Sequence, residues 1–183
     1  GVDSARLESE LLLARACDDC ARALLYAELD REMSDEQLRA FEANLARREK
    51  REPLAYILGE WGFRRLTLKT DRRALIPRPE TEVVVERALE HIRGIEEPKV
   101  LDVGTGTGAI ALAIADEVRD AQVTAIDVSP DALALARENL ELTRINGRVR
   151  LVEHDLTFGL GNADFDLVVS NPPYVEPDEL KTL

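Results

Sequence analysis

The amino-acid sequence predicts an α/β fold with a parallel sheet, preceded by a small helical domain and a β-hairpin linker. Leucines recur at spacings of three and four in the first fifty residues, which is typical of helices that bury one face. The spacing of apolar residues shortens to two between Glu60 and Thr70, as in a short hairpin. After Pro98, apolar runs alternate with helical patterns, which indicates parallel strands joined by right-handed helical crossovers.

The helical domain is expected over residues 1–53, with three groups of leucines. The groups are centred on Leu7, Leu11 and Leu12, on Leu24 and Leu25, and on Leu38, Phe41 and Leu45. Ser34 stands three residues before Gln37, which is the spacing of a capping box. A basic cluster at residues 47–51 complements the carbonyl end of the third helix before Pro53. The boundaries of that helix are therefore set at both ends.

The hairpin linker is expected over residues 54–76, and the α/β domain over residues 77–183. Two prolines, Pro77 and Pro79, predict an extended approach into a helix that carries Val84 and Val85. The expected strands are residues 99–103, 123–126, 149–152 and 165–169, and the expected helices between the first three are residues 109–118 and 130–142. The strands are continuously apolar, as strands of a buried parallel sheet are.

Length, composition and charge narrow the class of protein. A chain of 183 residues has room for one full domain and a small appendage. Its net charge of -12 makes duplex nucleic acid a poor partner unless basic residues cluster on one face. The basic residues between 47 and 78 are either solvated helix-end and loop charge or a docking surface for an acidic or RNA-associated partner. We expect a monomer without direct nucleic-acid binding.

No apolar run reaches the ~20 residues of a membrane span, and the N-terminus lacks a signal pattern. We therefore expect no membrane association and a cytoplasmic location. Cys17 and Cys20 are two residues apart, but the sequence has no second Cys pair to complete a zinc site. We expect no metal, and reduced thiols on a helix face.

A glycine-rich run, Leu-Asp-Val-Gly-Thr-Gly-Thr-Gly-Ala at residues 101–109, marks a strand that breaks into a loop and then starts a helix. Glycine allows the backbone to approach a ligand closely, and a helix N-terminus offers amide donors. The run predicts a nucleotide-like ligand. It fits both NAD and S-adenosylmethionine, because Gly104, Gly106 and Ala109 also satisfy the dinucleotide pattern.

Two aspartates follow the next two strands. Asp127 ends the second strand, where its carboxylate can accept hydrogen bonds from ribose hydroxyls. Ser129 and Pro130 just beyond it form a helix start. Asp155 follows the third strand and is either an acceptor for an adenine amino group or a loop residue that starts a turn. His91 and His154 have no visible set of partners and are interpreted as structural.

The run Ser-Asn-Pro-Pro-Tyr at residues 170–174 follows the fourth strand directly. An amide or exocyclic amine is a weak nucleophile because its lone pair is delocalised. If the Asn171 side-chain oxygen and the Pro172 carbonyl accept its two hydrogens, the nitrogen is held and its lone pair is favoured toward an electrophilic methyl group. Tyr174 can then pack on the planar group. This run predicts methyl transfer to a planar nitrogen.

Residues 102–108 together with Asn171 to Tyr174 resemble class I methyltransferases, which have a Rossmann-like sheet and modify planar nitrogens of adenine, cytosine or glutamine. The run Ile-Pro-Arg-Pro-Glu-Thr-Glu at residues 76–82, the run Arg-Glu-Pro-Leu-Ala-Tyr at residues 51–56 and the helical N-terminal domain are similar to peptide chain release factor glutamine methyltransferases. The resemblance covers nearly the whole chain. It also implies further strands beyond Leu183, so that the sheet is truncated at its C-terminal side.

The resemblance implies methylation of the glutamine in the Gly-Gly-Gln loop of release factors, in translation termination, with S-adenosylhomocysteine as the other product. The helical domain is implied to grip the release factor. The implied cofactor contacts are Gly104, Thr105, Gly106, Thr107, Gly108, Asp127, Asp155, Leu156 and Asn171. The implied substrate contacts are Asn171, Pro172, Pro173 and Tyr174, with Asn171, Pro172 and Tyr174 as the catalytic group. Relatives often carry an aromatic residue at the position of Leu156.

Four other functions stay open. A ribosomal-protein glutamine methyltransferase is a close sibling, although residues 77–81 favour the release-factor branch. An adenine-N6 nucleic-acid methyltransferase shares the Asn-Pro-Pro-Tyr chemistry but is disfavoured by the acidic composition. An NAD-dependent oxidoreductase explains the glycine loop and Asp127 and leaves residues 171–174 unexplained. A non-enzymatic binding module retains only the helical docking domain.

Overall fold

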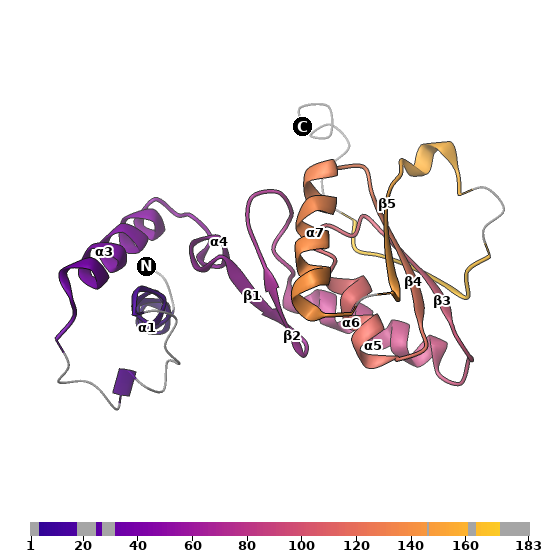
Figure 1. The fold of residues 1–183 in the computed structure, drawn as a ribbon, viewed down its shortest axis with the longest axis horizontal. Coiled ribbons are helices and arrows are strands. Elements are labelled where there is room, and N and C mark those ends of the chain that lie inside the picture. The colour runs from indigo at the N-terminus through magenta and orange to yellow at the C-terminus, as the bar shows by residue number, and fades with distance from the viewer. Residues whose placement is uncertain (1–3, 18–24, 27–31, 146, 161–163, 173–183) are drawn as a thin grey trace. The chain divides into compact units, whose positions relative to one another are not determined.

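The computed structural model describes residues 4–17, 25–26, 32–145, 147–160 and 164–172. The chain divides into two compact units, residues 1–60 and 61–183. The first unit is helical, and the second contains the hairpin and the parallel sheet (Figure 1). The helices and strands along the chain therefore follow the predicted order.

In the first unit, α1 (Ala5–Ala16) packs against α3 (Asp35–Glu49). Ser34 and Gln37 form the predicted capping box, with each side chain accepting from the backbone N–H of the other. Glu8 of α1 and Arg48 of α3 join the helices through an Nε to Oε2 contact of 2.6 Å. The capping-box prediction is therefore confirmed.

The first unit contains a helix that the sequence analysis did not predict. A short helix, α4 (Leu54–Leu58), follows Pro53 and ends at Gly59, which has a left-handed φ of 79°. Proline before a helix and glycine after it commonly mark the ends of a helix. Pro53 and Gly59 in the sequence therefore indicate this helix. The predicted helix around Leu24 lies mostly outside the described residues.

The second unit begins with the predicted hairpin, β1 (Glu60–Phe63) and β2 (Leu66–Lys69). Phe63 and Leu68 are fully buried and belong to the main apolar core. Arg64 occupies the turn with φ 50°. Its guanidinium pairs with Glu117, and its backbone N–H donates to the Glu82 carboxylate at 3.0 Å. The hairpin is thus anchored to the helices that cover the sheet.

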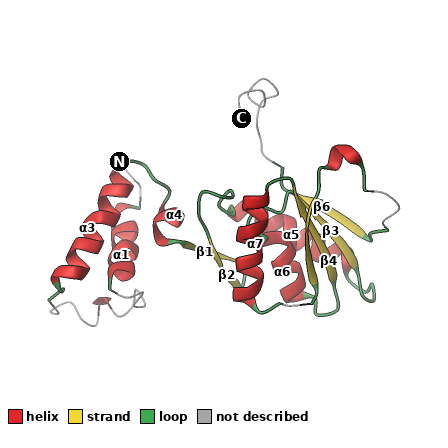
Figure 2. Cartoon of the chain, turned by 45° about the horizontal axis from the view of Figure 1, so that its top comes forward, coloured by secondary structure: helices red, strands yellow, loops and turns green. Residues whose placement is uncertain are grey.

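The sheet has four parallel strands in the order β5-β4-β3-β6. These are β3 (Lys99–Val103), β4 (Gln122–Asp127), β5 (Val149–Glu153) and β6 (Leu167–Ser170). The helices α5 (Pro79–Ile92), α6 (Ala109–Glu117) and α7 (Pro130–Thr143) lie along one face of it (Figure 2). The predicted Rossmann-like arrangement is confirmed.

The core lies between this face of the sheet and the helices. Val100, Val123 and Val149 are in register on three adjacent strands, and all three are buried in one cluster with α5 and α6. Every residue from Ala109 to Ala115 of α6 is buried. Four of those seven are alanines, and small side chains allow a helix to approach its neighbours closely. The start of α6 is therefore fixed relative to β3.

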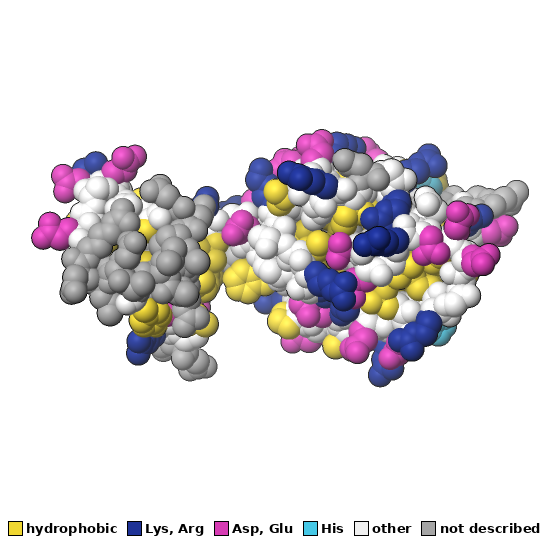
Figure 3. Space-filling model, turned by 60° about the horizontal axis from the view of Figure 1, so that its bottom comes forward, with side chains coloured by type: hydrophobic (Ala, Val, Ile, Leu, Met, Phe, Trp, Pro, Cys, Tyr) yellow, Lys and Arg dark blue, Asp and Glu magenta, His cyan; other side chains and the backbone are white. Residues whose placement is uncertain are grey.

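Basic and acidic side chains of the second unit form several ion pairs. On the face shown in Figure 3, basic and acidic side chains are interspersed over this unit. Lys69 and Arg73 pair with Glu138 on α7, at 2.8 and 2.6 Å. Arg73 also pairs with Asp71. Several of the basic residues singled out in the sequence therefore hold the fold together through ion pairs.

Replacing Gly108 tests the close packing at the start of α6. Gly108 has φ 83°, and an added Cβ would lie 3.2 Å from Leu112 Cδ1 and 3.4 Å from Ala136 Cβ. Gly94 has nearly the same φ, 84°, with nothing within 4 Å of an added Cβ. We expect Gly94→Ala to lower the free energy of unfolding by about 1–2 kcal/mol for the left-handed backbone. Gly108→Ala should lose about 1–3 kcal/mol more from overpacking.

Urea unfolding of the two variants gives the measurement. Equal losses would show that the side chains around Gly108 yield without penalty.

Candidate active site

The order of the strands makes the end of β3 a topological switch point. The chain passes from β3 to β4 on one side, and β6 returns on the other side. Ligands of open parallel sheets bind outside the carboxyl ends of the strands at such a switch point. Val103, Ile126 and Ser170 occupy matching register positions at that edge. The residues that follow them, Gly104, Asp127 and Asn171, therefore come to one edge.

The glycine loop folds across the end of β4. The backbone N–H groups of Gly104 and Thr105 donate to the Ile126 carbonyl at 2.9 and 3.0 Å. Gly104, Gly106 and Gly108 all have left-handed φ values. An added Cβ at Gly104 would meet nothing within 4 Å. Gly104 thus presents bare backbone to open space, as a residue of a nucleotide-binding loop does.

Asp127 lies beside this loop, as the sequence predicted. Its Oδ2 accepts from Gly106 N at 2.8 Å, and its Oδ1 accepts from Ser129 N at 3.0 Å. A carboxylate has about four acceptor positions, so both oxygens retain capacity for ribose hydroxyls. Ser129 is also the N-cap of α7, accepting from Ala132 N. Its predicted capping role is confirmed.

Asp102 is a buried carboxyl beneath the loop, and its side chain is fully excluded from solvent. Its Oδ2 accepts from Thr105 Oγ1 at 2.6 Å and from Ala111 N at 3.2 Å. Its Oδ1 has no hydrogen-bond partner among the described residues. Burial raises the pKa of Asp102 to about 6, against the opposing effect of the two hydrogen bonds.

The two threonines of the loop are buried, with exposed fractions of 7% for Thr105 and 3% for Thr107. Thr105 uses its hydroxyl on Asp102. The Thr107 carbonyl accepts from Asn139 Nδ2 at 2.9 Å. These two residues can therefore contact a ligand only through their backbone.

Asn139 of α7 connects the loop to the hairpin. It is fully buried, and besides Thr107 it binds Lys69 of β2, accepting from its N–H at 2.7 Å and donating to its carbonyl at 3.1 Å. A buried amide with three hydrogen bonds is well satisfied. Asn139 therefore fixes the loop against two other elements.

Asp155 and Leu156 follow β5 and lie at a short 3-10 helix, η1 (Leu156–Phe158). Asp155 is its N-cap and accepts from Thr157 N at 2.8 Å, and this backbone hydrogen bond holds the pKa of Asp155 below its usual value. The neighbouring His154 donates its N–H to the Asp127 carbonyl at 3.0 Å. The turn-forming interpretation of Asp155 is thus seen directly, and its contact with adenine stays a prediction.

Asn171 and Pro172 follow β6 at the same edge. Ser170 Oγ donates to the Val103 carbonyl at 2.8 Å, which ties the end of β6 to the end of β3. Asn171 Nδ2 donates to Thr81 Oγ1 at 3.0 Å. Pro173 and Tyr174 lie outside the described residues. Asn171 thus lies next to the strand that leads into the glycine loop.

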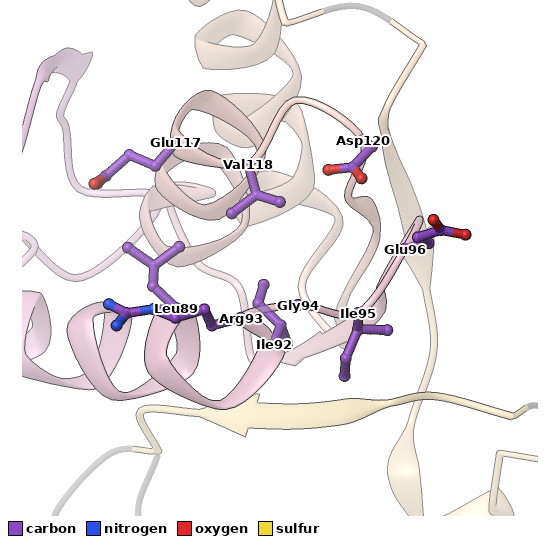
Figure 4. Close-up of a pocket in the computed structure, with 9 residues that line it drawn as sticks. All are labelled: Leu89, Ile92, Arg93, Gly94, Ile95, Glu96, Glu117, Val118 and Asp120. Atoms are coloured by element: carbon purple, nitrogen blue, oxygen red, sulfur yellow. The ribbon is translucent and has the colours of Figure 1, made fainter.

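A hollow of about 460 Å³ lies at the other edge of the sheet. Leu89, Ile92, Val118 and Asp120 are among its lining residues, where α5 and α6 end (Figure 4). None of the described residues predicted to bind cofactor or substrate lines it. Those residues lie instead at the carboxyl ends of the strands.

In the part of the chain that the structure describes, no group of three or more His, Cys, Asp or Glu residues is placed to hold a metal ion. Cys17 lies at the end of α1 as a thiol outside any disulfide, and Cys20 is outside the described residues. No described helix is long and apolar enough to cross a membrane.

The sequence interpretation missed three residues that shape the site: Asp102, Asn139 and Thr81. Asp102 is a charged residue among the buried apolar residues of β3, and the sequence shows this directly. Asn139 gave no signal, and Thr81 was noticed only as part of the run at residues 76–82. The partner of each lies far away along the chain.

Family models agree with this architecture. The model described as Methyltransferase small domain matches residues 81–182, which is more than half of the chain. The chain belongs to the methyltransferase small domain family. A second model, described as PrmC N-terminal domain, matches residues 1–59.

Curated relatives of this chain include proteins named release factor glutamine methyltransferase. The one from Geobacter sulfurreducens is 45% identical over 183 residues, which cover 100% of this chain and 63% of that protein. The one from Deinococcus radiodurans is 45% identical over 177 residues, covering 96% and 62%. The chain thus spans less than two thirds of the length of these relatives.

A solved structure of an S-adenosylmethionine-dependent methyltransferase from Thiobacillus denitrificans, in complex with S-adenosylhomocysteine, is also similar. It has a TM-score of 0.42 and 22% identity, and the match covers 51% of this chain and 36% of that one.

Asp102→Asn tests the buried carboxyl. The pKa of Asp102 is about 6 in the folded protein against 3.8 for the free group, so the folded state binds the proton more tightly. Stability from this group is therefore greatest at low pH and falls as pH rises from about 4 to about 6. Asparagine keeps an acceptor for Thr105 and Ala111 and does not titrate.

We expect wild type to lose roughly 2–3 kcal/mol relative to Asp102→Asn between about pH 4 and pH 7. Urea unfolding across this range measures it, and parallel stability curves would contradict the assignment.

Proposed function

We propose that the full-length protein is a cytoplasmic methyltransferase that uses S-adenosylmethionine to methylate the side-chain amide of the release-factor glutamine. One observation carries the proposal: Asn171 is held next to the end of β3, where the glycine loop begins. A group that binds a planar amide and a loop that binds a nucleotide-like donor thus share one edge of the sheet. The names of the curated relatives support a release-factor glutamine as the group that receives the methyl.

The residues at this edge fit the proposed donor. Gly104 leaves open space over the loop. Asp127 offers acceptor positions to ribose hydroxyls. S-adenosylmethionine supplies a methyl group on a positively charged sulfur, and a cluster of carboxyl groups around the loop is compatible with that charge. The donor site would be formed by Gly104 to Gly108, Asp127 and Asp155.

Asn171 and Pro172 are the residues that would bind the amide group of the substrate. Their two carbonyl oxygens can accept the two N–H hydrogens of a glutamine amide, which orients the nitrogen lone pair toward the donor. The new N–C bond forms as the bond between the methyl group and sulfur breaks, which releases S-adenosylhomocysteine and leaves the positive charge on nitrogen. This charge acidifies the remaining N–H, so a proton then passes to water and no strong general base is needed. The same oxygens stabilise this developing charge.

Competing functions explain less of this edge. An oxidoreductase that binds NAD accounts for the glycine loop and Asp127, and it leaves the held Asn171 without a role. An adenine methyltransferase uses the same acceptor pair, and the net charge of -12 disfavours the phosphate backbone. A ribosomal-protein glutamine methyltransferase would use identical chemistry and differ only in the protein it docks.

The test is transfer of labelled methyl from S-adenosylmethionine to a purified release factor. The same factor with its loop glutamine replaced is the control, and a ribosomal protein and an oligonucleotide are competing acceptors. Label on the native factor alone supports the proposal. Label on the oligonucleotide with an unmodified release factor contradicts it.

Asn171→Ala tests the two-acceptor chemistry in the same assay. We expect turnover to fall by about 100-fold or more, because the acceptor nitrogen loses its orientation. The dissociation constant for S-adenosylmethionine, measured by calorimetry, should change by less than about threefold, or under 1 kcal/mol. Equal losses in both would show that Asn171 mainly binds the donor or maintains the fold.

A further inference from the structure

Thr81 of α5 contacts Asn171, the residue proposed to bind the substrate amide. It lies in the first turn of α5, and its side chain is 5% exposed. Its Oγ1 accepts from Asn171 Nδ2 at 3.0 Å, across 90 positions of sequence. The run of residues 76–82, which includes Thr81, has no other role in the proposed chemistry.

Helix capping does not account for this threonine. The N-cap of α5 is Arg78, which makes no side-chain cap, and Pro79 is at the first helical position. Thr81 is three residues beyond the N-cap, and its own N–H donates to the Arg78 carbonyl at 2.9 Å. The buried hydroxyl is therefore directed at Asn171 rather than at the end of its own helix.

The contact decides which end of the Asn171 amide meets a substrate. An asparagine side chain has an NH₂ donor on one side and a carbonyl acceptor on the other. Because the nitrogen is held by Thr81, the oxygen is the end directed elsewhere. A carbonyl oxygen has two acceptor positions, so it can take a substrate N–H alongside another contact.

Both partners are anchored independently. Next to Thr81, the Glu82 carboxylate accepts from Arg64 N at 3.0 Å, and the Glu82 carbonyl accepts from Arg64 Nη1 at 3.3 Å. Arg64 is held in turn by Glu117 of α6, with Nη2 to Oε2 at 3.0 Å. Ser170 fixes the other partner to β3. The hydrogen bond between Thr81 and Asn171 thus joins two rigid parts of the second unit.

We propose that Thr81 is a positioning residue that orients the Asn171 amide so that its oxygen accepts the N–H of the substrate. The inference rests on the proposed function, in which the side-chain oxygen of Asn171 accepts a hydrogen bond from the substrate amide. It gives residues 76–82 a function in the site: they bring a hydroxyl from the start of α5 to the end of β6. Loss of that hydroxyl removes the hydrogen bond that holds the amide nitrogen.

The experiment compares Thr81→Val with Thr81→Ser in the full-length protein. Valine keeps the branched shape and removes the hydroxyl, whereas serine keeps the hydroxyl. We expect kcat of Thr81→Val to fall by about 10-fold to 100-fold, because the Asn171 oxygen is no longer held in position to accept the substrate N–H. The dissociation constant for S-adenosylmethionine should stay within about twofold. Thr81→Ser should recover most of the lost turnover.

A double-mutant cycle separates positioning from a structural role. In the Asn171→Ala background, Thr81→Val should cause little further loss, because the side chain that it orients is gone. A full additional loss in that background would overturn the inference, and so would a Thr81→Ser variant as slow as Thr81→Val. If Thr81→Val does not fold, Thr81→Ala takes its place in the cycle.

The outcome also distinguishes this inference from the proposed function. If Asn171→Ala lowers turnover and Thr81→Val does not, only the role of Thr81 is wrong. If Asn171→Ala leaves turnover unchanged, the acceptor role of Asn171 itself is wrong.

Discussion

The register of the parallel strands around β3 is the constraint on which the site depends. Val103 is opposite Ile126 of β4 and Ser170 of β6, so three strands end at one level. Gly104 and Asn171 directly follow β3 and β6, and Asp127 is the last residue of β4. A shift of one residue would move a side chain to the other face of the sheet, and the backbone loop, carboxylate and amide would no longer meet.

Buried polar groups hold this arrangement in place. Asn139 forms hydrogen bonds with both the glycine loop and the hairpin. The Asp102 carboxyl accepts hydrogen bonds from Thr105 in the loop and from Ala111 near the start of α6. Such groups are stabilising only when they are hydrogen-bonded. The loop can therefore keep its left-handed glycines and open backbone, because its other side is tied to the sheet and to α7.

Much of the fold followed from the sequence because its signals are local. The alternation of apolar runs predicted β3 to β6, and Ser34 and Ser129 marked helix starts through neighbours three residues away. The glycine loop, Asp127 and Asn171 were also predicted, since each ends or directly follows a strand. The partners of Asn171 and of Thr107 were not, because Thr81 and Asn139 reach them only after the chain has folded.

The central claim is that the glycine loop, Asp127 and Asn171 form a site for S-adenosylmethionine beside a planar acceptor. Calorimetric titration of the full-length protein with S-adenosylmethionine, S-adenosylhomocysteine and NAD tests it most directly. Saturable binding of the first two without binding of NAD is the predicted result. Binding of NAD without binding of S-adenosylmethionine would contradict the account and assign the site to a dinucleotide.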